Sequence, residues 1–319
     1  MQSVLNSTVS LVIPVYQNEG SIADLTNALE WLNKQMDSNL EVVFVVDGSR
    51  DQSYALLQDA LAAATFKSQL ITLSRNFGAF AAIRCGLEKA NGKYIAVMAA
   101  DLQEPIDLIP KFFSLLQQEQ HDVVFGVREA RQDPWLSKLA SKTFWAIYRY
   151  WVMPEIPAGG VDVFAVSDRF RQRLVQLRES NSSLLAQLFW LGGRRAFVGY
   201  ERQQRKHGKS AWTFRKKIRY FSDSIFSFTD LPVRLLIGLG TFSFITATLL
   251  STITLFAKLS GLVAVPGYAG TMLTILFFGA LNSLGLGVVG TYAWRAYENT
   301  KSRPLALIQS EETFEGKSP

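Results

Sequence analysis

Cysteine and histidine are scarce in this sequence of 319 residues, which contains one cysteine, Cys85, and two histidines. A single cysteine excludes a disulfide bond within the chain and is typical of proteins in a reducing compartment. A secretory signal is also missing, because residues 1–10 contain no basic side chain and the apolar run at 11–15 is too short. These absences predict an N-terminus that stays in the cytoplasm.

Charge is absent from two long stretches near the C-terminus. Residues 235–257 and residues 259–294 contain no Asp, Glu, Lys or Arg. At about 1.5 Å per residue, the first stretch would form a helix of roughly 34 Å, enough to cross a hydrocarbon core of about 30 Å. Helices of soluble proteins usually have about 10–14 residues. The pattern therefore predicts transmembrane helices at 234–258 and 270–294 rather than two buried core helices.

Basic residues flank these stretches on one side of the expected membrane. Five precede the first stretch and three follow the second, whereas the loop 259–269 has no charge and only Lys258 stands beside it. Because basic residues collect on the cytoplasmic side, a domain at 1–213 and the tail at 295–319 are expected inside. The flanking residues are Arg215, Lys216, Lys217, Arg219, Arg234, Arg295, Lys301 and Arg303.

The net charge of +6 is concentrated in residues 194–219, which contain ten Lys or Arg residues and one acid, Glu201. Nucleic-acid binding is one interpretation of such a stretch. Its position beside a membrane span favours anionic lipid head groups or a phosphorylated substrate instead. We therefore expect a membrane partner and no nucleic acid.

An amphipathic helix is predicted over residues 214–233. Ile218, Phe221, Ile225 and Phe228 recur at spacings of three, four and three, with polar residues between them. Such a helix can lie in the membrane interface or pack on the catalytic domain. Both arrangements are possible together if neighbouring subunits share the helix.

Short β-rich runs alternate with helical patterns between residues 9 and 165. Apolar strands are predicted at 9–16, 41–47, 68–74, 93–101 and 121–127, and helices at 22–36, 53–65 and 79–90. Continuous apolar strands that alternate with helices are typical of a parallel sheet covered on both faces. The fold class expected for this domain is therefore α/β and doubly wound.

Polar residues follow four of these strands, where ligands bind in such sheets. Asp47 and Arg75 could bind a nucleotide base and a phosphate, and Asp101 and Gln103 could bind a hard cation such as Mg²⁺. One such Asp alone is more often a helix N-cap. Four consecutive polar strand ends favour a nucleotide diphosphate site.

Six motifs occur in order along nearly the whole chain: IPVYQNE, SRNFG, ADLQEP, VVFGVR, HGKSAW and YENTKSRP. This succession resembles the GT-A-fold polyisoprenyl-phosphate glycosyltransferases, the group of dolichol-phosphate mannose synthase. Within that group the chain is most similar to the bacterial GtrB-type bactoprenol glucosyltransferases, which have two C-terminal spans. The resemblance implies a GT-A (Rossmann-like) catalytic domain, a multi-pass protein of the bacterial inner membrane and a homo-oligomer, by resemblance a tetramer.

The resemblance also implies a donor site. Its nucleotide-sugar residues would be Pro14, Tyr16, Glu19, Asp47, Ser49, Arg75 and Asp101, with Mg²⁺ or Mn²⁺ held by Asp101 and Gln103. Two positions depart from the family pattern, because Val46 and Ala99 replace acids. The change at Ala99 removes one expected metal ligand. By resemblance the donor is UDP-glucose, with GDP-mannose and UDP-N-acetylglucosamine as the competitors.

An acceptor site is expected in the basic stretch before the membrane. A plausible phosphate cradle combines Arg and Lys side chains with a Ser hydroxyl, and its residues would be Arg128, Arg202, Arg205, Lys209 and Ser210. The resemblance implies that Asp101, Gln103 and Asp162 are catalytic residues. Asp162 aligns with a family acid and would orient a sugar hydroxyl or the Arg cluster, or cap a turn. His207 is expected to be a bystander. An unspecific basic surface remains the alternative.

These features predict inverting transfer of a hexose to a polyprenyl phosphate such as undecaprenyl phosphate. Phosphate monoesters are largely dianionic at neutral pH, so the acceptor needs no general base, only positioning and stabilisation of the leaving diphosphate. Three alternatives stay open: transfer of mannose or an N-acetylhexosamine, a processive polysaccharide synthase, and an inactive scaffold or flippase partner. The Gln-x-x-Arg-Trp motif of processive synthases is absent, since the nearest stretch is QLFW at 187–190.

Overall fold

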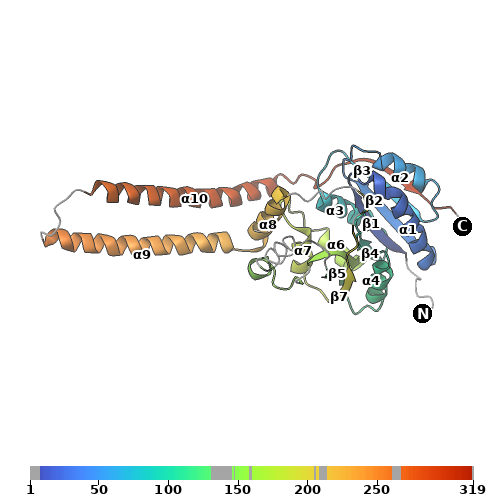
Figure 1. The fold of residues 1–319 in the computed structure, drawn as a ribbon, viewed down its shortest axis with the longest axis horizontal. Coiled ribbons are helices and arrows are strands. Elements are labelled where there is room, and N and C mark those ends of the chain that lie inside the picture. Colours follow the sequence, from blue (N-terminus) through green and yellow to red (C-terminus); the bar gives the residue numbers. More distant parts are fainter. Residues whose placement is uncertain are drawn as a thin grey trace.

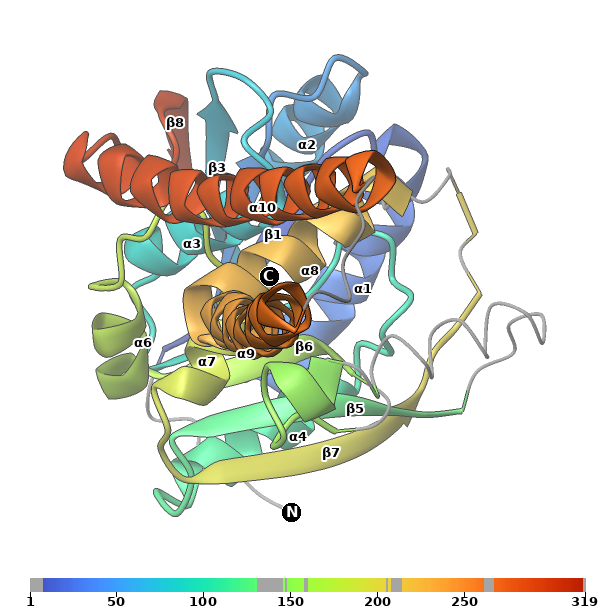
Figure 2. The ribbon, with the colours of Figure 1, turned by 90° about the vertical axis from the view of Figure 1, so that its left-hand side faces the viewer.

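The computed structural model describes residues 8–130, 146, 148–157, 160–204, 206–207, 214–260 and 267–317. Its centre is an eight-stranded sheet in the order β7-β5-β6-β4-β1-β2-β3-β8 (Figures 1 and 2). The strands are β1 Val9–Val15, β2 Leu40–Val46, β3 Lys67–Leu73, β4 Tyr94–Val97, β5 Val123–Ala130, β6 Val161–Ser167, β7 Arg195–Glu201 and β8 Ile308–Phe314.

Helices cover both faces of this sheet, as the alternating pattern predicts. The helices are η1 Glu19–Ser21, α1 Ile22–Gln35, α2 Ser53–Leu61, α3 Ala79–Lys89, α4 Leu108–Gln117, α6 Asp168–Leu174 and α7 Leu184–Trp190. Apolar residues of α1, α2 and α4 form one core cluster on one face. Those of α3, α6 and α7 form a second cluster on the other face. The predicted α/β fold is confirmed, and the first three predicted helices begin at the predicted residues.

The sheet is mostly parallel, but it has antiparallel parts that the sequence pattern did not predict. Strand β4 pairs parallel with β1, whereas β6 runs antiparallel to both β4 and β5. At the far edge, β8 runs antiparallel to β3. Residues 295–319 are therefore not a simple tail, because part of this segment is an edge strand of the catalytic sheet.

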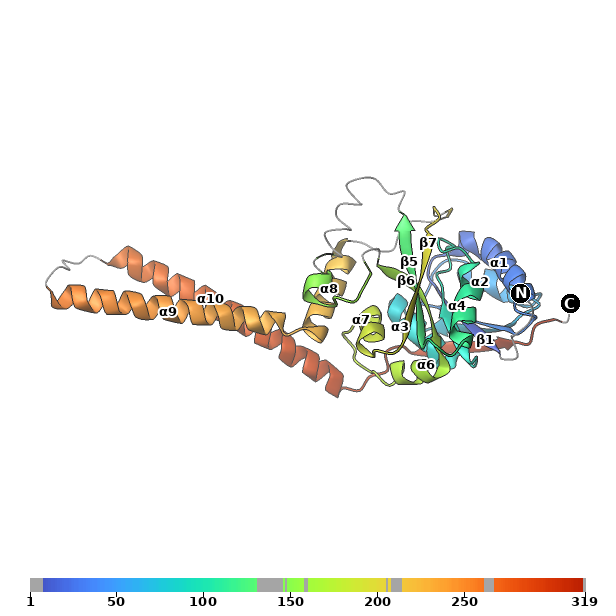
Figure 3. The same ribbon diagram turned by 90° about the horizontal axis from the view of Figure 1, so that it is seen from below.

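Three helices follow the sheet domain: α8 Phe214–Phe228, α9 Leu231–Leu259 and α10 Tyr268–Thr300. The last two lie side by side and project from the domain, with α9 running away from it and α10 running back to it (Figures 1 and 3). Within the described residues, one helix meets the length and apolarity needed to cross a membrane, α9 over Leu231–Leu250. Only 6% of that stretch is buried, so α9 is not a core helix of the described domain.

Helix α8 packs on the domain through three of the four residues of its predicted apolar face, whereas the fourth, Ile218, is 54% exposed. Tyr220, Phe221, Ile225 and Phe228 contact the second core cluster. The Tyr220 ring also stacks on the buried Tyr148, with ring centroids 5.9 Å apart. Packing on the catalytic domain, one of the two arrangements considered for this helix, is therefore observed.

The single thiol should be inert in the folded protein. Cys85 on α3 is 7% exposed, and burial raises the pKa of its thiol to about 11, with Glu88 adding to the rise and Lys89 opposing it. Because the thiolate is the reactive form, labelling by iodoacetamide should be about a hundredfold or more slower than for free cysteine between pH 7 and 9. Mass spectrometry of the native chain, with the guanidinium-unfolded chain as control, measures this. Complete labelling of native protein within minutes would contradict it.

Candidate active site

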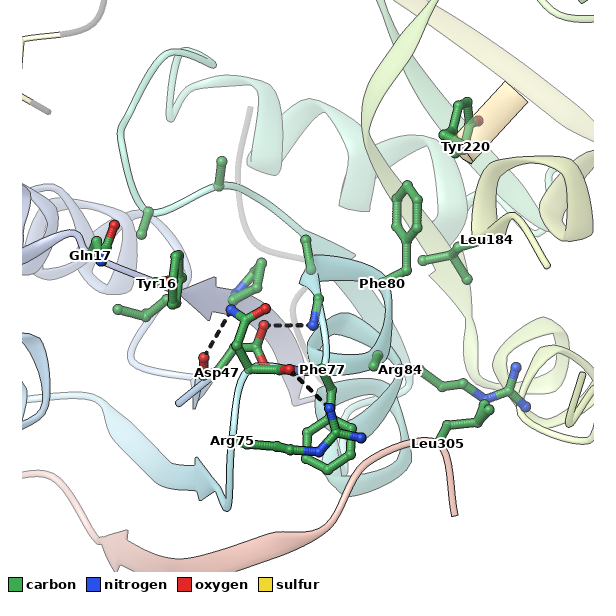
Figure 4. Close-up of a pocket in the computed structure, with 18 of the residues that line it drawn as sticks. Tyr16, Gln17, Asp47, Arg75, Phe77, Phe80, Arg84, Leu184, Tyr220 and Leu305 are labelled. Atoms are coloured by element: carbon green, nitrogen blue, oxygen red, sulfur yellow. Dashed lines mark hydrogen bonds between the residues drawn. The ribbon is translucent and has the colours of Figure 1, made fainter. Parts of the chain in front are cut away.

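A cavity of about 950 Å³ opens where β1 to β4 end at their carboxyl edge (Figure 4). It extends from these strand ends towards α7 and α8. Of the residues expected to bind a nucleotide sugar, five line it: Pro14, Tyr16, Asp47, Arg75 and Asp101. The polar strand ends that were predicted to meet therefore do meet at one site.

Asp47 organises the loop that carries Arg75. Its carboxylate is 2% exposed and accepts hydrogen bonds from the backbone N–H groups of Phe77 at 2.7 Å and Gly78 at 2.8 Å. The Asn76 side chain donates to the Asp47 carbonyl at 3.2 Å. These bonds fix the turn from β3 into α3 against the end of β2. Asp47 thus shapes the cavity wall as well as lining it.

A glycine allows this close approach of the two backbones. Gly48 has a φ of +59°, and a Cβ built there would lie 2.3 Å from the carbonyl carbon of Arg75. Only glycine combines that conformation with that contact. Beside it, the Arg75 guanidinium lies over the Phe77 ring, 4.1 Å from its centroid. The Arg75 side chain is thereby directed along the loop at the cavity edge.

Glu19 and Ser49 belong to a hydrogen-bonded corner rather than to the cavity lining. The Ser49 hydroxyl donates to Asp51 at 2.5 Å, and Glu19 accepts from the Gln52 N–H at 3.0 Å. Burial raises the pKa of Asp51, but hydrogen bonds from Ser49, Ser53 and the Glu19 N–H outweigh it and lower the pKa. The Asp51 carboxylate thus connects the residues of this corner. In the sequence, only its place in the motif DGSRD at 47–51 pointed to it.

The two residues expected to hold a metal ion differ in their surroundings. Asp101 lines the cavity, and its carboxylate accepts the Gln103 N–H at 3.3 Å. The Gln103 amide oxygen accepts a hydrogen bond from Arg202 at 2.7 Å, so a cation at that oxygen would have to displace a guanidinium. No group of three or more His, Cys, Asp or Glu side chains suited to a metal occurs in the described part of the chain.

Asp101 nevertheless fits a divalent cation that is shared with a diphosphate. Mg²⁺ keeps several waters and is often bound through one or two carboxylates plus substrate phosphates. Asp101 and Ala99 both line the cavity, and Asp101 is the one of the two that can provide a metal ligand. The donor set therefore suits a cation that arrives with the substrate.

Arg128 and Asp162 form an ion pair, and neither residue is part of the cavity lining. The Arg128 side chain is 13% exposed and contacts the Asp162 carboxylate, which also accepts a hydrogen bond from the Tyr200 hydroxyl at 3.1 Å. Tyr200 is itself buried. Asp162 thus orients the guanidinium of Arg128, one of the three roles considered for it.

Glu104 is a buried acid for which the sequence pattern predicted no role. It is 3% exposed, and its nearest cation is Arg202, whose Nε lies 4.0 Å from Oε1. Burial raises the pKa of Glu104 to about 7, repulsion from Asp162 and Asp101 adds to this, and Arg202 and Arg128 oppose it. Its place in ADLQEP was the only signal. The contact with Arg202 joins the expected metal motif to the expected acceptor motif.

The sequence matches the description "Glycosyl transferase family 2" over residues 10–218, which is more than half of the chain. The chain belongs to glycosyl transferase family 2. It is therefore a glycosyltransferase enzyme, as predicted. The match covers the whole sheet domain except β8 and ends within α8.

Relatives of this family 2 transferase are similar to it along almost their full length. It is 29% identical to a bactoprenol glucosyl transferase of Shigella phage SfX, covering 95% of this chain and 99% of the relative. It is 31% identical to an undecaprenyl-phosphate 4-deoxy-4-formamido-L-arabinose transferase of Aeromonas hydrophila, covering 94% and 92%. Among solved structures, glucosyl-3-phosphoglycerate synthase of Mycobacterium tuberculosis with Mn²⁺, UDP and glucosyl-3-phosphoglycerate has a TM-score of 0.46 and 16% identity, covering 64% and 74%.

Three of the residues expected to bind the acceptor, Arg205, Lys209 and Ser210, lie outside the described residues of this transferase. His207 is among the described residues and lines the cavity. Its Nε2 lies 3.9 Å from Oδ2 of Asp24. From the sequence, His207 was expected to be a bystander. His207 reaches the cavity because its side chain lies next to Gly20, and a Cβ at Gly20 would be 3.2 Å from the His207 Cβ. No local pattern around residue 207 indicates this contact.

Proposed function

We propose that this family 2 transferase moves a hexose, glucose in our assignment, from UDP-glucose to a polyprenyl phosphate such as undecaprenyl phosphate. Transfer takes place at the cytoplasmic face of the membrane and inverts the anomeric carbon. The single observation that carries the proposal is a cavity at the strand ends that is large enough for a nucleotide and extends to α8. Helix α8 leads into α9 and α10, which form an exposed apolar hairpin. Relatives named for bactoprenol and undecaprenyl phosphate support the choice of acceptor, and the glucosyl relative supports the choice of sugar.

Two spans are proposed for the membrane part, because β8 returns to the sheet. The chain leaves the domain after α8 and rejoins it when β8 pairs with β3. A chain that crosses a membrane and comes back to the same domain must cross an even number of times. If α9 crosses, α10 must cross back, and α10 exposes Ile275, Leu286 and Val289 along its length. This supports a multi-pass protein with its catalytic domain and both termini in the cytoplasm.

The donor would lie with its base near Tyr16 and Asp47 and its diphosphate between Arg75 and Asp101. Mg²⁺ or Mn²⁺, held by Asp101 and the diphosphate, would supply charge stabilisation for the leaving nucleotide. Arg128 and Arg202 would hold the acceptor phosphate in line with the anomeric carbon. Because that phosphate is already largely dianionic, the protein needs to supply orientation and electrostatic stabilisation rather than a general base.

The proposal predicts a lipid-linked product. With purified full-length protein in detergent and radiolabelled UDP-glucose, label should enter the organic phase only when undecaprenyl phosphate is present. GDP-mannose and UDP-N-acetylglucosamine serve as parallel donors, and the anomeric configuration of released sugar reports inversion. Label that appears only in water-soluble or polymeric material would overturn the acceptor assignment. Preference for another donor would overturn the choice of glucose alone.

A further inference from the structure

The cavity has a second end that the strand-end residues do not explain. It is lined by a loop between α6 and α7 and by α8, and the polar lining residues there are Glu179, Ser180, Ser182 and Asp223. Figure 4 shows Leu184 of α7 and Tyr220 of α8, which line this end, on the opposite side of the pocket from Tyr16 and Gln17. If the nucleotide part of the donor binds at the strand ends, this part of the cavity is free for the rest of the donor.

The cytoplasmic end of α10 holds this loop from outside. The Arg295 guanidinium donates to the Asn181 carbonyl at 3.0 Å and pairs with the Asp223 carboxylate at 2.6 Å. The Asn299 side chain accepts the Ser180 N–H at 3.1 Å. The Arg295 side chain is only 15% exposed. One arginine of the hairpin thus joins two separate walls of the cavity, the loop and α8.

Buried side chains hold the same loop from inside. The Gln187 amide group donates to Glu179 at 3.1 Å and to Ser182 at 3.2 Å. Arg84, which is 4% exposed, donates to the Val175 carbonyl at 2.8 Å and lies 3.5 Å from the Gln187 amide oxygen. The carboxylate and hydroxyl of the loop are therefore fixed on both sides while they line the cavity.

The chemistry of this end suits a sugar better than a phosphate. Carboxylate and hydroxyl oxygens accept hydrogen bonds from sugar hydroxyl groups. The Glu179 and Asp223 carboxylates line the same surface and would repel a phosphate dianion at close range. Arg84 also lines the cavity, but it is 4% exposed, and its guanidinium already donates to the Val175 carbonyl. The guanidinium of Arg295 is already directed at Asp223. A neutral, hydroxyl-rich group is the occupant that these residues favour.

We propose that the loop of Glu179 to Ser182 binds the sugar of the donor, and that Arg295 of α10 is the positioning residue that holds this loop. This assignment rests on the proposed function, because it takes the substrate to be a nucleotide sugar. It makes the membrane hairpin part of the donor site, although Arg295 itself touches no substrate. The nucleotide end, built from Asp47 and Arg75, does not depend on Arg295.

The test compares UDP with UDP-glucose, which differ only in the sugar and its phosphate linkage. Calorimetry on the full-length protein in detergent should show that Arg295→Ala weakens binding of UDP-glucose about tenfold and of UDP less than twofold. Arg295→Lys should restore part of the loss, because lysine keeps the charge but not the planar fork that reaches two acceptors. Arg234→Ala is the matched control, since Arg234 makes an exposed ion pair with Asp230 at the base of α9.

Glu179→Ala tests the sugar contact without touching the hairpin, and it should show the same selective loss. Equal losses of UDP and UDP-glucose in Arg295→Ala, or no loss in both variants, overturn the sugar assignment while leaving the proposed function intact. A wild-type protein that binds neither UDP nor UDP-glucose overturns the proposed donor and the sugar assignment together. A thermal melt of each variant identifies a fold that has been lost, in which case Glu179→Ala decides.

Discussion

Asp101→Ala should abolish sugar transfer, lowering kcat by about a thousandfold or more. Asp101 is the carboxylate of its motif that lines the cavity, and Ala99 provides no second acid to replace it. Removing a group that stabilises charge on the leaving diphosphate typically costs 10²–10³-fold, and loss of a bound metal adds to this. The measurement is the initial rate of lipid-linked product formation at saturating donor and acceptor, with Mg²⁺ present.

Ala99→Asp is the matched variant, because it restores the acid at the position where the family has one. It should leave transfer intact or tighten Mg²⁺ binding. In the wild type, calorimetry should detect tight metal binding only when the nucleotide diphosphate is present, since one carboxylate does not offset the dehydration of Mg²⁺. Full activity of Asp101→Ala in a chelator would refute the role given to Asp101. Tight metal binding by the nucleotide-free wild type would refute the shared site.

Arg128→Ala should destabilise the catalytic domain by about 1–3 kcal/mol. The Arg128 side chain is mostly buried, whereas the side chain of its partner Asp162 is 30% exposed, and the buried Glu104 lies in the same group of charges. Removing the charged partner of a buried or half-buried group typically costs about 1–3 kcal/mol, because the remaining charge loses its compensation. Urea unfolding of the full-length protein in detergent, followed by tryptophan fluorescence, gives the change in free energy of unfolding.

The double variant Arg128→Ala with Asp162→Asn is the control for this reasoning. If the cost comes from an unpaired Asp162 carboxylate, the second substitution should recover part of the stability lost in the first. Losses that add without any recovery would mean that Arg128 acts through packing of its side chain alone. A loss below about 1 kcal/mol, the usual range for exposed pairs, would show that the pair is open to solvent.

Much of the central sheet could be predicted because its parallel strands are apolar along most of their length. Strand β2, for example, is buried at every position from Leu40 to Val46, and Glu41 is its one polar residue. Strand β8 could not be predicted in the same way, since its sequence IQSEETF is polar and its residues alternate between exposed and half-buried. Its place in the sheet depends on residues far away in sequence. One of them is Lys89 of α3, whose Nζ lies 2.5 Å from Oε2 of Glu311.

The candidate site also has a part that could be predicted from the sequence and a part that could not. Residues at strand ends, such as Asp47 and Asp101, could be predicted because parallel strands bring their carboxyl ends to one edge. The partners of these residues could not. The hydrogen bond from Arg202 to Gln103 joins residues 99 positions apart, and the loop of Glu179 becomes part of the cavity only through contacts with α7 and α10. Local spacing carries no information about such contacts.

The position of β8 in the sheet constrains how the protein is made. Thr72 in β3 contacts Ser310 in β8, and 238 positions of sequence separate them. During synthesis, β3 therefore emerges long before its neighbour, and its edge stays open while α9 and α10 are made. Open strand edges template association between chains, and contacts of such long range form slowly. Nascent copies can therefore associate through this edge until β8 emerges, so the final step of catalytic-domain folding follows the synthesis of α9 and α10.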